Sequence, residues 1–146
     1  MLFQGYLRNG IVYVPTIVKL QTGAYMNVEP VAVVPVANAD ALRRSFSEVI
    51  AKKNAIVANP PKDKWPPPVL PKYAGVKSWS AFARGASLWN IEETDGEYRI
   101  VGHRKHSKGY LEPVSDQVVE LPPGSSVDQV IDRMIGILQE AARAPS

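Results

Sequence analysis

Two histidines near the end of a predicted strand have the clearest capacity for chemistry. His103 and His106 lie in a run of cations that comprises Arg99, Arg104, Lys105 and Lys108. A pair of imidazoles can exchange protons near neutral pH, and a cation stabilises the charge that develops when a phosphodiester is cleaved. However, side chains alternate between the faces of a strand, so the imidazoles converge only if the strand bends. No carboxylate is placed to orient either ring, and we therefore predict no enzymatic activity.

The same region is the best candidate for binding a macromolecule. The cations could contact phosphates, with Trp79, Trp89 and Tyr98 as stacking platforms for bases, or they could meet an acidic protein surface. Stacking requires exposed rings, whereas Trp89 and Tyr98 are expected on an inner face. The pattern does not separate a protein interface from a solvated strand end. The predicted partner-binding residues are Trp79, Arg84, Arg99, His103, Arg104, Lys105, His106 and Lys108.

Local signals predict the elements that carry these residues. Ser78 can cap a short helix over residues 79–84 that Gly85 ends. Asp95-Gly96 favours a two-residue turn between strands 86–93 and 97–104. That register places Trp89, Ile91, Tyr98 and Ile100 on one face, and it pairs Glu92 with Arg99 on the other.

The N-terminal third predicts a three-stranded meander followed by a helix. Asn9-Gly10 is a second turn signal, between strands 2–8 and 11–20, and a third strand over residues 24–36 contains two prolines typical of an edge. Asn38 can cap a helix over residues 39–53, where Leu42, Phe46, Val49 and Ile50 form an apolar stripe.

The remaining segments predict a connector, a strand and a long helix. Residues 59–72 contain six prolines and should run extended, with Trp65 holding the segment against the body. Residues 117–121 predict the last strand. Ser125 and Ser126 begin a helix that reaches about Arg143, with an apolar stripe from Val127 through Leu138 to Ala142.

These elements predict a single α+β domain of residues 1–146, with an antiparallel sheet of about five or six strands packed by two main helices. The 146-residue chain has no cysteine, which excludes disulfides and thiolate metal sites, and we expect neither a metal nor a cofactor. No apolar run is long enough to span a bilayer and no secretion signal is evident, so we expect a cytoplasmic protein without membrane contact.

Charge is unevenly distributed along the chain. The net charge is +3, but Met1 to Lys108 carry 15 lysines and arginines against eight acidic residues, whereas Gly109 to Ser146 carry two against six. Such asymmetry is typical of a surface that meets an oppositely charged partner, although it also arises from uneven solvation.

Three segments resemble small immunity proteins of bacterial contact-dependent growth inhibition systems. They are YAGVKSWSAFARGASLWNIEETDGEYRI, the basic strand VGHRKH and the ending VVELPPGSSVDQVIDRMIGILQEAA, together about half of the chain. The resemblance implies a cytoplasmic protein that binds the C-terminal domain of a cognate toxin, often a nuclease, and covers its active site without catalysis. Members of this family differ widely in fold and interface, so no binding residue is transferred by position.

The resemblance therefore predicts a toxin-neutralising protein that is a monomer or a weak dimer. The alternative is a nucleic-acid-binding protein or small ribonuclease that uses residues 99–108. Antidotes to nucleases tend to be acidic, whereas this chain is basic up to Lys108. Either the toxin presents an acidic contact face, or the acidic portion after Gly109 meets it.

Overall fold

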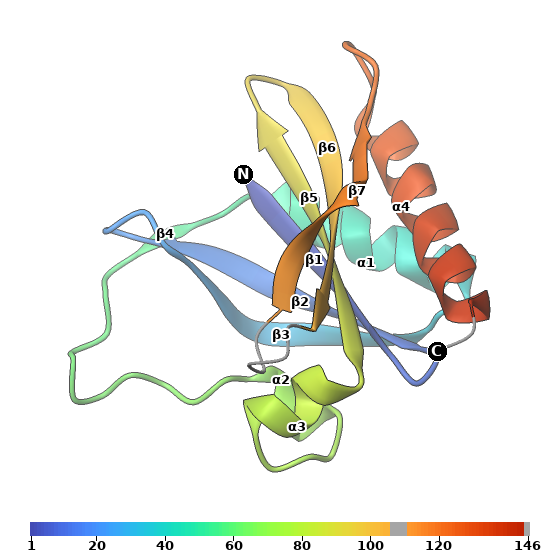
Figure 1. The fold of residues 1–146 in the computed structure, drawn as a ribbon. Helices are drawn as coiled ribbons and strands as arrows, with labels where there is room; N and C mark the ends of the chain where they lie inside the picture. Colours follow the sequence, from blue (N-terminus) through green and yellow to red (C-terminus); the bar gives the residue numbers. More distant parts are fainter. Residues whose placement is uncertain (106–110, 145–146) are drawn as a thin grey trace.

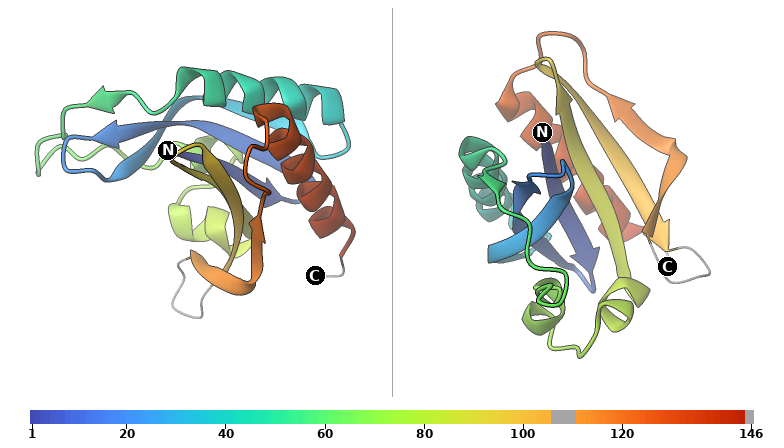
Figure 2. Two further views of the ribbon diagram at one scale, coloured as in Figure 1. Left: turned by 90° about the horizontal axis from the view of Figure 1, so that it is seen from above. Right: turned by 90° about the vertical axis from the view of Figure 1, so that its left-hand side faces the viewer.

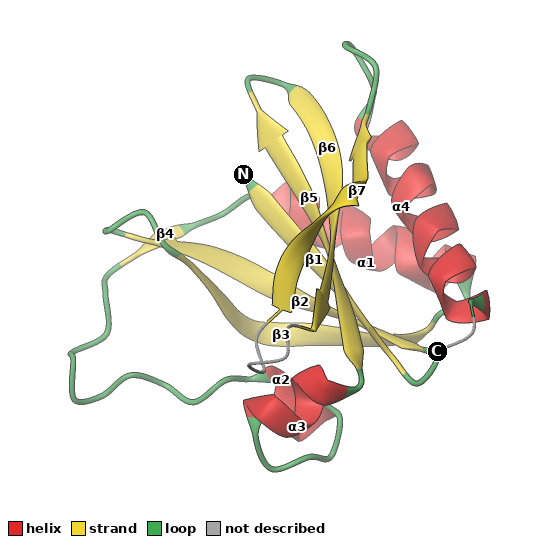
Figure 3. Ribbon diagram, viewed as in Figure 1, coloured by secondary structure: helices red, strands yellow, loops and turns green. Residues whose placement is uncertain are grey.

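The computed structural model describes residues 1–105 and 111–144, apart from the side chains of 105, 115 and 116. Its central element is a twisted, mainly antiparallel sheet (Figures 1 and 3). The strands are β1 (Leu2–Arg8), β2 (Ile11–Leu20), β3 (Tyr25–Pro35), β4 (Ile56–Val57), β5 (Ala86–Thr94), β6 (Glu97–Lys105) and β7 (Leu111–Glu120). The helices are α1 (Ala39–Lys52), α2 (Leu70–Tyr73), α3 (Trp79–Arg84) and α4 (Val127–Arg143).

The strand order is β3-β2-β1-β5-β6-β7, and the short β4 pairs in parallel with the end of β2. The predicted α+β class is confirmed. The seven strands within the described residues exceed the expected five or six because β4 has only two residues, too few for a periodic signal.

Both predicted hairpin turns are confirmed. Asn9 and Gly10 have φ angles of 51° and 76°, and Asp95 and Gly96 have φ angles of 52° and 81°. Positive φ at both central positions defines a type I′ turn, whose twist matches that of the flanking strands. The register of β5 and β6 is also as predicted, with Ile91 opposite Ile100 and Glu92 opposite Arg99.

Strand β3 lies at one edge of the sheet, as its prolines predict. Pro30 and Pro35 lack an N–H group, which an edge position tolerates. At the other edge, β7 begins at Leu111 rather than at the predicted residue 117. The earlier half of this strand contains Pro113 and lacks regular alternation, so periodicity did not reveal it.

Side-chain caps fix the starts of the two main helices. The Asn38 Oδ1 accepts a hydrogen bond from the Ala41 N–H at 3.1 Å, at the start of α1. At α4, Ser126 and Gln129 satisfy each other's backbone N–H groups in a capping box. Helices α1 and α4 are linked across their exposed sides by an ion pair between Arg43 and Asp132, whose Nη2 and Oδ1 atoms lie 2.9 Å apart. This hydrogen bond and the charge of Asp132 raise the pKa of Arg43.

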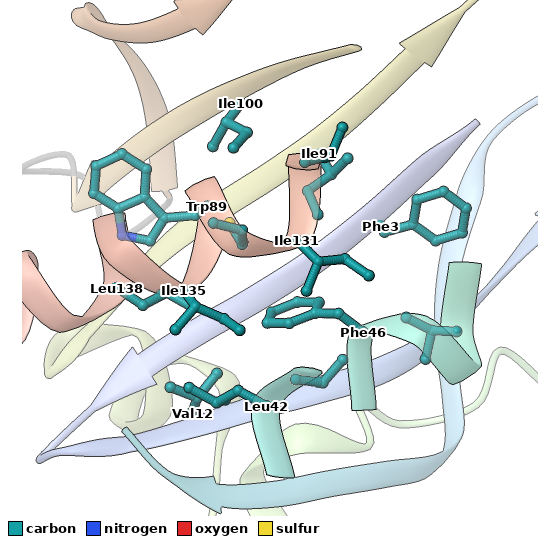
Figure 4. Close-up of a cluster of buried hydrophobic side chains, with 14 of the residues drawn as sticks. Phe3, Val12, Leu42, Phe46, Trp89, Ile91, Ile100, Ile131, Ile135 and Leu138 are labelled. Atoms are coloured by element: carbon teal, nitrogen blue, oxygen red, sulfur yellow. The ribbon is translucent and has the colours of Figure 1, made fainter. Parts of the chain in front are cut away.

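Helices α1 and α4 cover one face of the sheet, and α2 and α3 lie against the opposite face (Figure 2). The larger core is between the sheet and α1 and α4 (Figure 4). From the sheet it takes Phe3, Leu7, Val12, Val14, Val34, Trp89, Ile91 and Ile100; from the helices it takes Leu42, Phe46, Val49, Ile50, Val130, Ile131, Met134, Ile135 and Leu138. The predicted apolar stripe of α1 is confirmed in full, and that of α4 is confirmed except at its two ends, where Val127 and Ala142 are exposed.

A second core on the opposite face was not predicted. Phe82 and Leu70 are fully buried there against Tyr6, Tyr13 and Leu88. Tyr6 and Tyr13 meet Phe82 edge-on, with ring centroids 5.7 and 5.4 Å away. This cluster draws on two short helices and three strands, so no single segment of sequence carries its pattern.

The proline-rich connector differs from the expectation in two ways. Residues 61–69 are irregular, but Leu70–Tyr73 form a helical turn in which Pro71 occupies one of the first positions, where a missing N–H costs little. Trp65 does not hold the connector down by burial, since 56% of its surface is exposed.

Candidate binding surface

The predicted basic residues lie along one strand and one helix end rather than in a single pocket. Arg99, His103 and Arg104 are on β6, and Arg84 is the exposed last residue of α3. Arg99 and His103 are four residues apart, about 13 Å along an extended strand, and alternation directs Arg104 to the other face. Lys105 ends β6, and its side chain, like all of His106 and Lys108, lies outside the described residues.

Arg99 is surrounded by carboxylates. Its Nε lies 2.6 Å from the Glu92 Oε1, which confirms the predicted cross-strand pair. Both residues line a cleft of about 580 Å³ at the end of the β5–β6 hairpin, together with the acidic residues Asp95, Glu97 and Glu120. The local charge here is therefore negative, although the surrounding sequence is basic.

His103 lies half-buried in the sheet, opposite Leu88 of β5. Its Nδ1 is 3.2 Å from the carbonyl oxygen of Val101, two residues earlier on the same strand. Burial lowers the pKa of His103, and the Val101 carbonyl and the charge of Glu92 only partly oppose this effect. The imidazole is therefore neutral at pH 7.

We expect His103 to titrate below 6.5 in an NMR pH titration, with the signal assigned by its loss in His103→Gln. Because the pKa is lower in the folded state, unfolded chains bind more protons in acid. The stability conferred by the neutral imidazole is therefore complete above pH 6.5 and is lost as the pH falls through the folded pKa. In urea unfolding, His103→Gln should lose less stability than the wild type between pH 7.5 and 5. A folded pKa at or above 6.5 would contradict the burial argument.

Trp79 is engaged with the second core. Its ring stacks on Phe82 at a centroid distance of 5.6 Å and meets Tyr6 edge-on at 5.9 Å. It remains half-buried, so one side of the indole still borders a cleft. Trp89, by contrast, is 8% exposed and belongs to the larger core, which excludes it as a stacking platform.

That cleft, which sequence reasoning missed, has a volume of about 410 Å³ and lies between the connector and strands β1 and β3. Its walls are the prolines Pro66–Pro68 and the aromatic rings of Tyr25, Trp65 and Trp79. None of the described residues that line it carries a charge. We call it the connector cleft.

The floor of the connector cleft is a chain of three hydrogen-bonded polar side chains. The Tyr6 hydroxyl donates to the Gln4 Oε1 at 3.1 Å and accepts from the Asn27 Nδ2 at 3.3 Å. Burial raises the pKa of Tyr6 to about 12, although both hydrogen bonds oppose this, so the phenol stays neutral. The only sequence signal was the alternation that places Gln4 and Tyr6 on one face of β1.

Among the described residues, no three histidine or acidic side chains are grouped so as to hold a metal ion, and no helix is long and apolar enough to cross a membrane. No family model and no curated protein sequence matches the chain. Among solved structures it is similar to a protein of unknown function, NMB0488 from Neisseria meningitidis. The TM-score is 0.68 at 14% identity, over 97% of this chain and 94% of that one, which establishes a shared fold.

Proposed function

We propose that this chain is a cytoplasmic immunity protein that binds the C-terminal domain of a cognate bacterial toxin, a nuclease, and neutralises it by covering its active site. The observation that carries the proposal is the resemblance of three segments to the immunity proteins of contact-dependent growth inhibition systems. In the fold these segments are neighbours. They supply α3, β5, β6, the end of β7 and α4, and so form one half of the molecule.

The exposed charges support binding to a protein. The acidic cleft at the β5–β6 turn and the exposed Arg84 of α3 are parts of this same half, at separate places on its surface. A surface with both signs of charge selects its partner through complementary potential and accelerates encounter. A nuclease that binds a polyanion requires positive charge near its active site, which the carboxylates around Arg99 complement.

The residues of the ribonuclease alternative do not form a catalytic arrangement in the described part of the chain. Arg99 is neutralised by Glu92, and the hydrogen bonds of His103 to other described residues are to the backbone of Val101 and Leu88. Nucleic-acid binding or cleavage is therefore not proposed, and the experiment described below would detect it.

The test is co-expression with the toxin domain encoded by the neighbouring gene. We expect the two proteins to co-elute in size-exclusion chromatography, and we expect the purified chain to inhibit the nuclease at equimolar concentration. Arg84→Glu should weaken the complex by about tenfold or more, since charge reversal at an interface opposes association. Arg44→Glu, an exposed position of α1 on the other side of the sheet, should leave it unchanged.

Two results would contradict the proposal. One is the absence of a complex with the neighbouring gene product. The other is binding of single-stranded RNA by the isolated chain with a steep salt dependence, which reports phosphate contacts. If RNA is hydrolysed, the double variant His103→Ala and His106→Ala must abolish the activity before those residues are assigned to it.

A further inference from the structure

The connector cleft presents a hydrogen-bond donor and an acceptor that nothing in the described structure uses. The Tyr6 hydroxyl is hydrogen-bonded to the Gln4 Oε1 and to the Asn27 Nδ2, so these two atoms are already paired. Within the described residues, the Gln4 Nε2 and the Asn27 Oδ1 have no hydrogen-bond partner. Since Tyr6 is 3% exposed and fixes both amides, the free donor and the free acceptor are held on strands β1 and β3 before any ligand arrives.

The walls of the cleft select a flat and uncharged group. Aromatic rings and prolines are the usual lining of sites that take aromatic side chains, and burying a charge beside them without a partner is costly. Trp65 contributes an indole that is 56% exposed, so an occupant that covers it removes a large apolar surface from water. Tryptophan in this situation is the residue type most enriched at interface hot spots.

Several lysines lie around the cleft. Lys62 and Lys64 precede Trp65 on the exposed connector, and the Lys19 Nζ lies 5.8 Å from the ring centroid of Tyr25. None of these three lysines takes part in an ion pair with another described residue. Glu29 is bound to Lys72. Glu92 and Glu93, which border Tyr25 in a neighbouring cleft, pair with Arg99 and with the N-terminal amine. The carboxylate of Asp63, on the connector itself, takes part in no ion pair with another described residue. Positive charge therefore exceeds negative charge at this rim.

We propose that the connector cleft receives a tyrosine side chain from an acidic loop of the partner protein. A phenol hydroxyl can accept from the Gln4 Nε2 and donate to the Asn27 Oδ1, which satisfies both free groups with one atom. Its ring packs between the prolines and the indole of Trp65, and acidic residues on either side of the tyrosine pair with the lysines of the rim. The inference rests on the proposed function for the identity of the partner, a toxin domain, but not for the chemistry of the cleft.

The cleft can be tested without the toxin. The probe is a capped tripeptide of aspartate, tyrosine and aspartate, titrated into the isotope-labelled protein and followed by NMR. We expect saturable shifts of the Trp65 indole N–H and of the Gln4 and Asn27 side-chain amides, with a Kd of about 1 mM. A phenylalanine tripeptide should bind about fivefold more weakly because it lacks the hydroxyl, and a tripeptide with lysines in place of the aspartates should bind more weakly still.

Variants locate the binding. Trp65→Ala should weaken the tripeptide about tenfold while leaving the fold intact, because the side chain is largely exposed. Ile56→Ala removes another exposed apolar side chain, 73% exposed and outside the cleft, and should have no effect. The proposal is overturned if the amide signals do not shift or if the phenylalanine peptide binds equally well. It is also overturned if uridine monophosphate, the probe for nucleic-acid binding at this cleft, binds more tightly than the tripeptide.

The same variants separate this inference from the proposed function. If Trp65→Ala leaves the toxin complex unchanged while Arg84→Glu weakens it, the immunity function stands and the tyrosine assignment fails. If the tripeptide binds as expected but the neighbouring gene product forms no complex, the cleft stands as an aromatic-binding site and the toxin proposal fails.

Discussion

Replacing Phe46 by alanine is expected to lower the free energy of unfolding by about 4 kcal/mol. The ring of Phe46 is completely buried between α1, the sheet and α4 (Figure 4). A Cβ built on Gly5 of β1 would lie 3.0 Å from the Phe46 Cζ and 3.2 Å from the Met134 Cε, so the ring rests on the bare backbone of that strand. Truncation leaves a cavity that neither the strand nor the two helices can fill without moving.

Such a loss is large, because small domains are stabilised by only about 5–15 kcal/mol. Urea unfolding followed by circular dichroism measures it. The matched control is Val127→Ala, at an apolar position of α4 whose side chain is 36% exposed, and its cost should stay below about 1 kcal/mol. A cost for Phe46→Ala no greater than that of Val127→Ala would show that the two helices do not share a core through this ring.

The parts of the fold that the sequence predicted are those whose physical cause is local. Asn9-Gly10 and Asp95-Gly96 tolerate the positive φ angles of a type I′ turn, and each turn fixes the register of the strands beside it. A serine that accepts from the N–H three residues later similarly defines the start of a helix, as at Ser126. These signals need no knowledge of the rest of the chain.

The second core depends on contacts that are distant in sequence. Leu70 belongs to a helical turn that follows three prolines, and Phe82 to a six-residue helix, so neither has enough neighbours for a helical period. Both become buried only because β1 and β2 bring Tyr6 and Tyr13 to the same face. The partner tyrosines were assigned to strands correctly, but the element that covers them could not be inferred from the strands.

The sequence predicted part of the candidate site, namely the strand, the alternation of its side chains and the pairing of Arg99 with Glu92. It did not indicate that Asp95, Glu97 and Glu120 line the same cleft, because these residues come from a turn and two strands. The connector cleft is assembled from β1, β3 and the proline-rich segment, and its polar floor of Gln4, Tyr6 and Asn27 has no recognisable spacing. Only the tertiary arrangement brings these groups together.

Gly102→Ala should destabilise the protein by about 2–3 kcal/mol, although it adds a single methyl group. Gly102 lies directly opposite Trp89 in the β5–β6 ladder, and the indole extends over it. A Cβ at this position would lie 2.4 Å from the Trp89 Cζ3 and 2.8 Å from its Cη2, far inside the contact distance of about 3.5 Å between carbon atoms. Because Trp89 is 8% exposed and packed in the larger core, the ring cannot move aside without disturbing its neighbours.

The steric cause can be isolated by a double-mutant cycle measured in urea. In a Trp89→Leu background the clash with the indole is gone, and only the flexible end of Gln117, whose Oε1 would lie 2.7 Å from the Cβ, has to shift. Gly102→Ala should therefore cost less than about 1 kcal/mol there. The matched control is Gly136→Ala, the same substitution on the exposed side of α4, where a Cβ would meet nothing within 4 Å. It should stabilise the protein by about 0.5–1 kcal/mol through helix propensity. Equal costs for Gly102→Ala in the two backgrounds would mean that the backbone of β6 or the side chain of Gln117, rather than the indole of Trp89, requires glycine at this position.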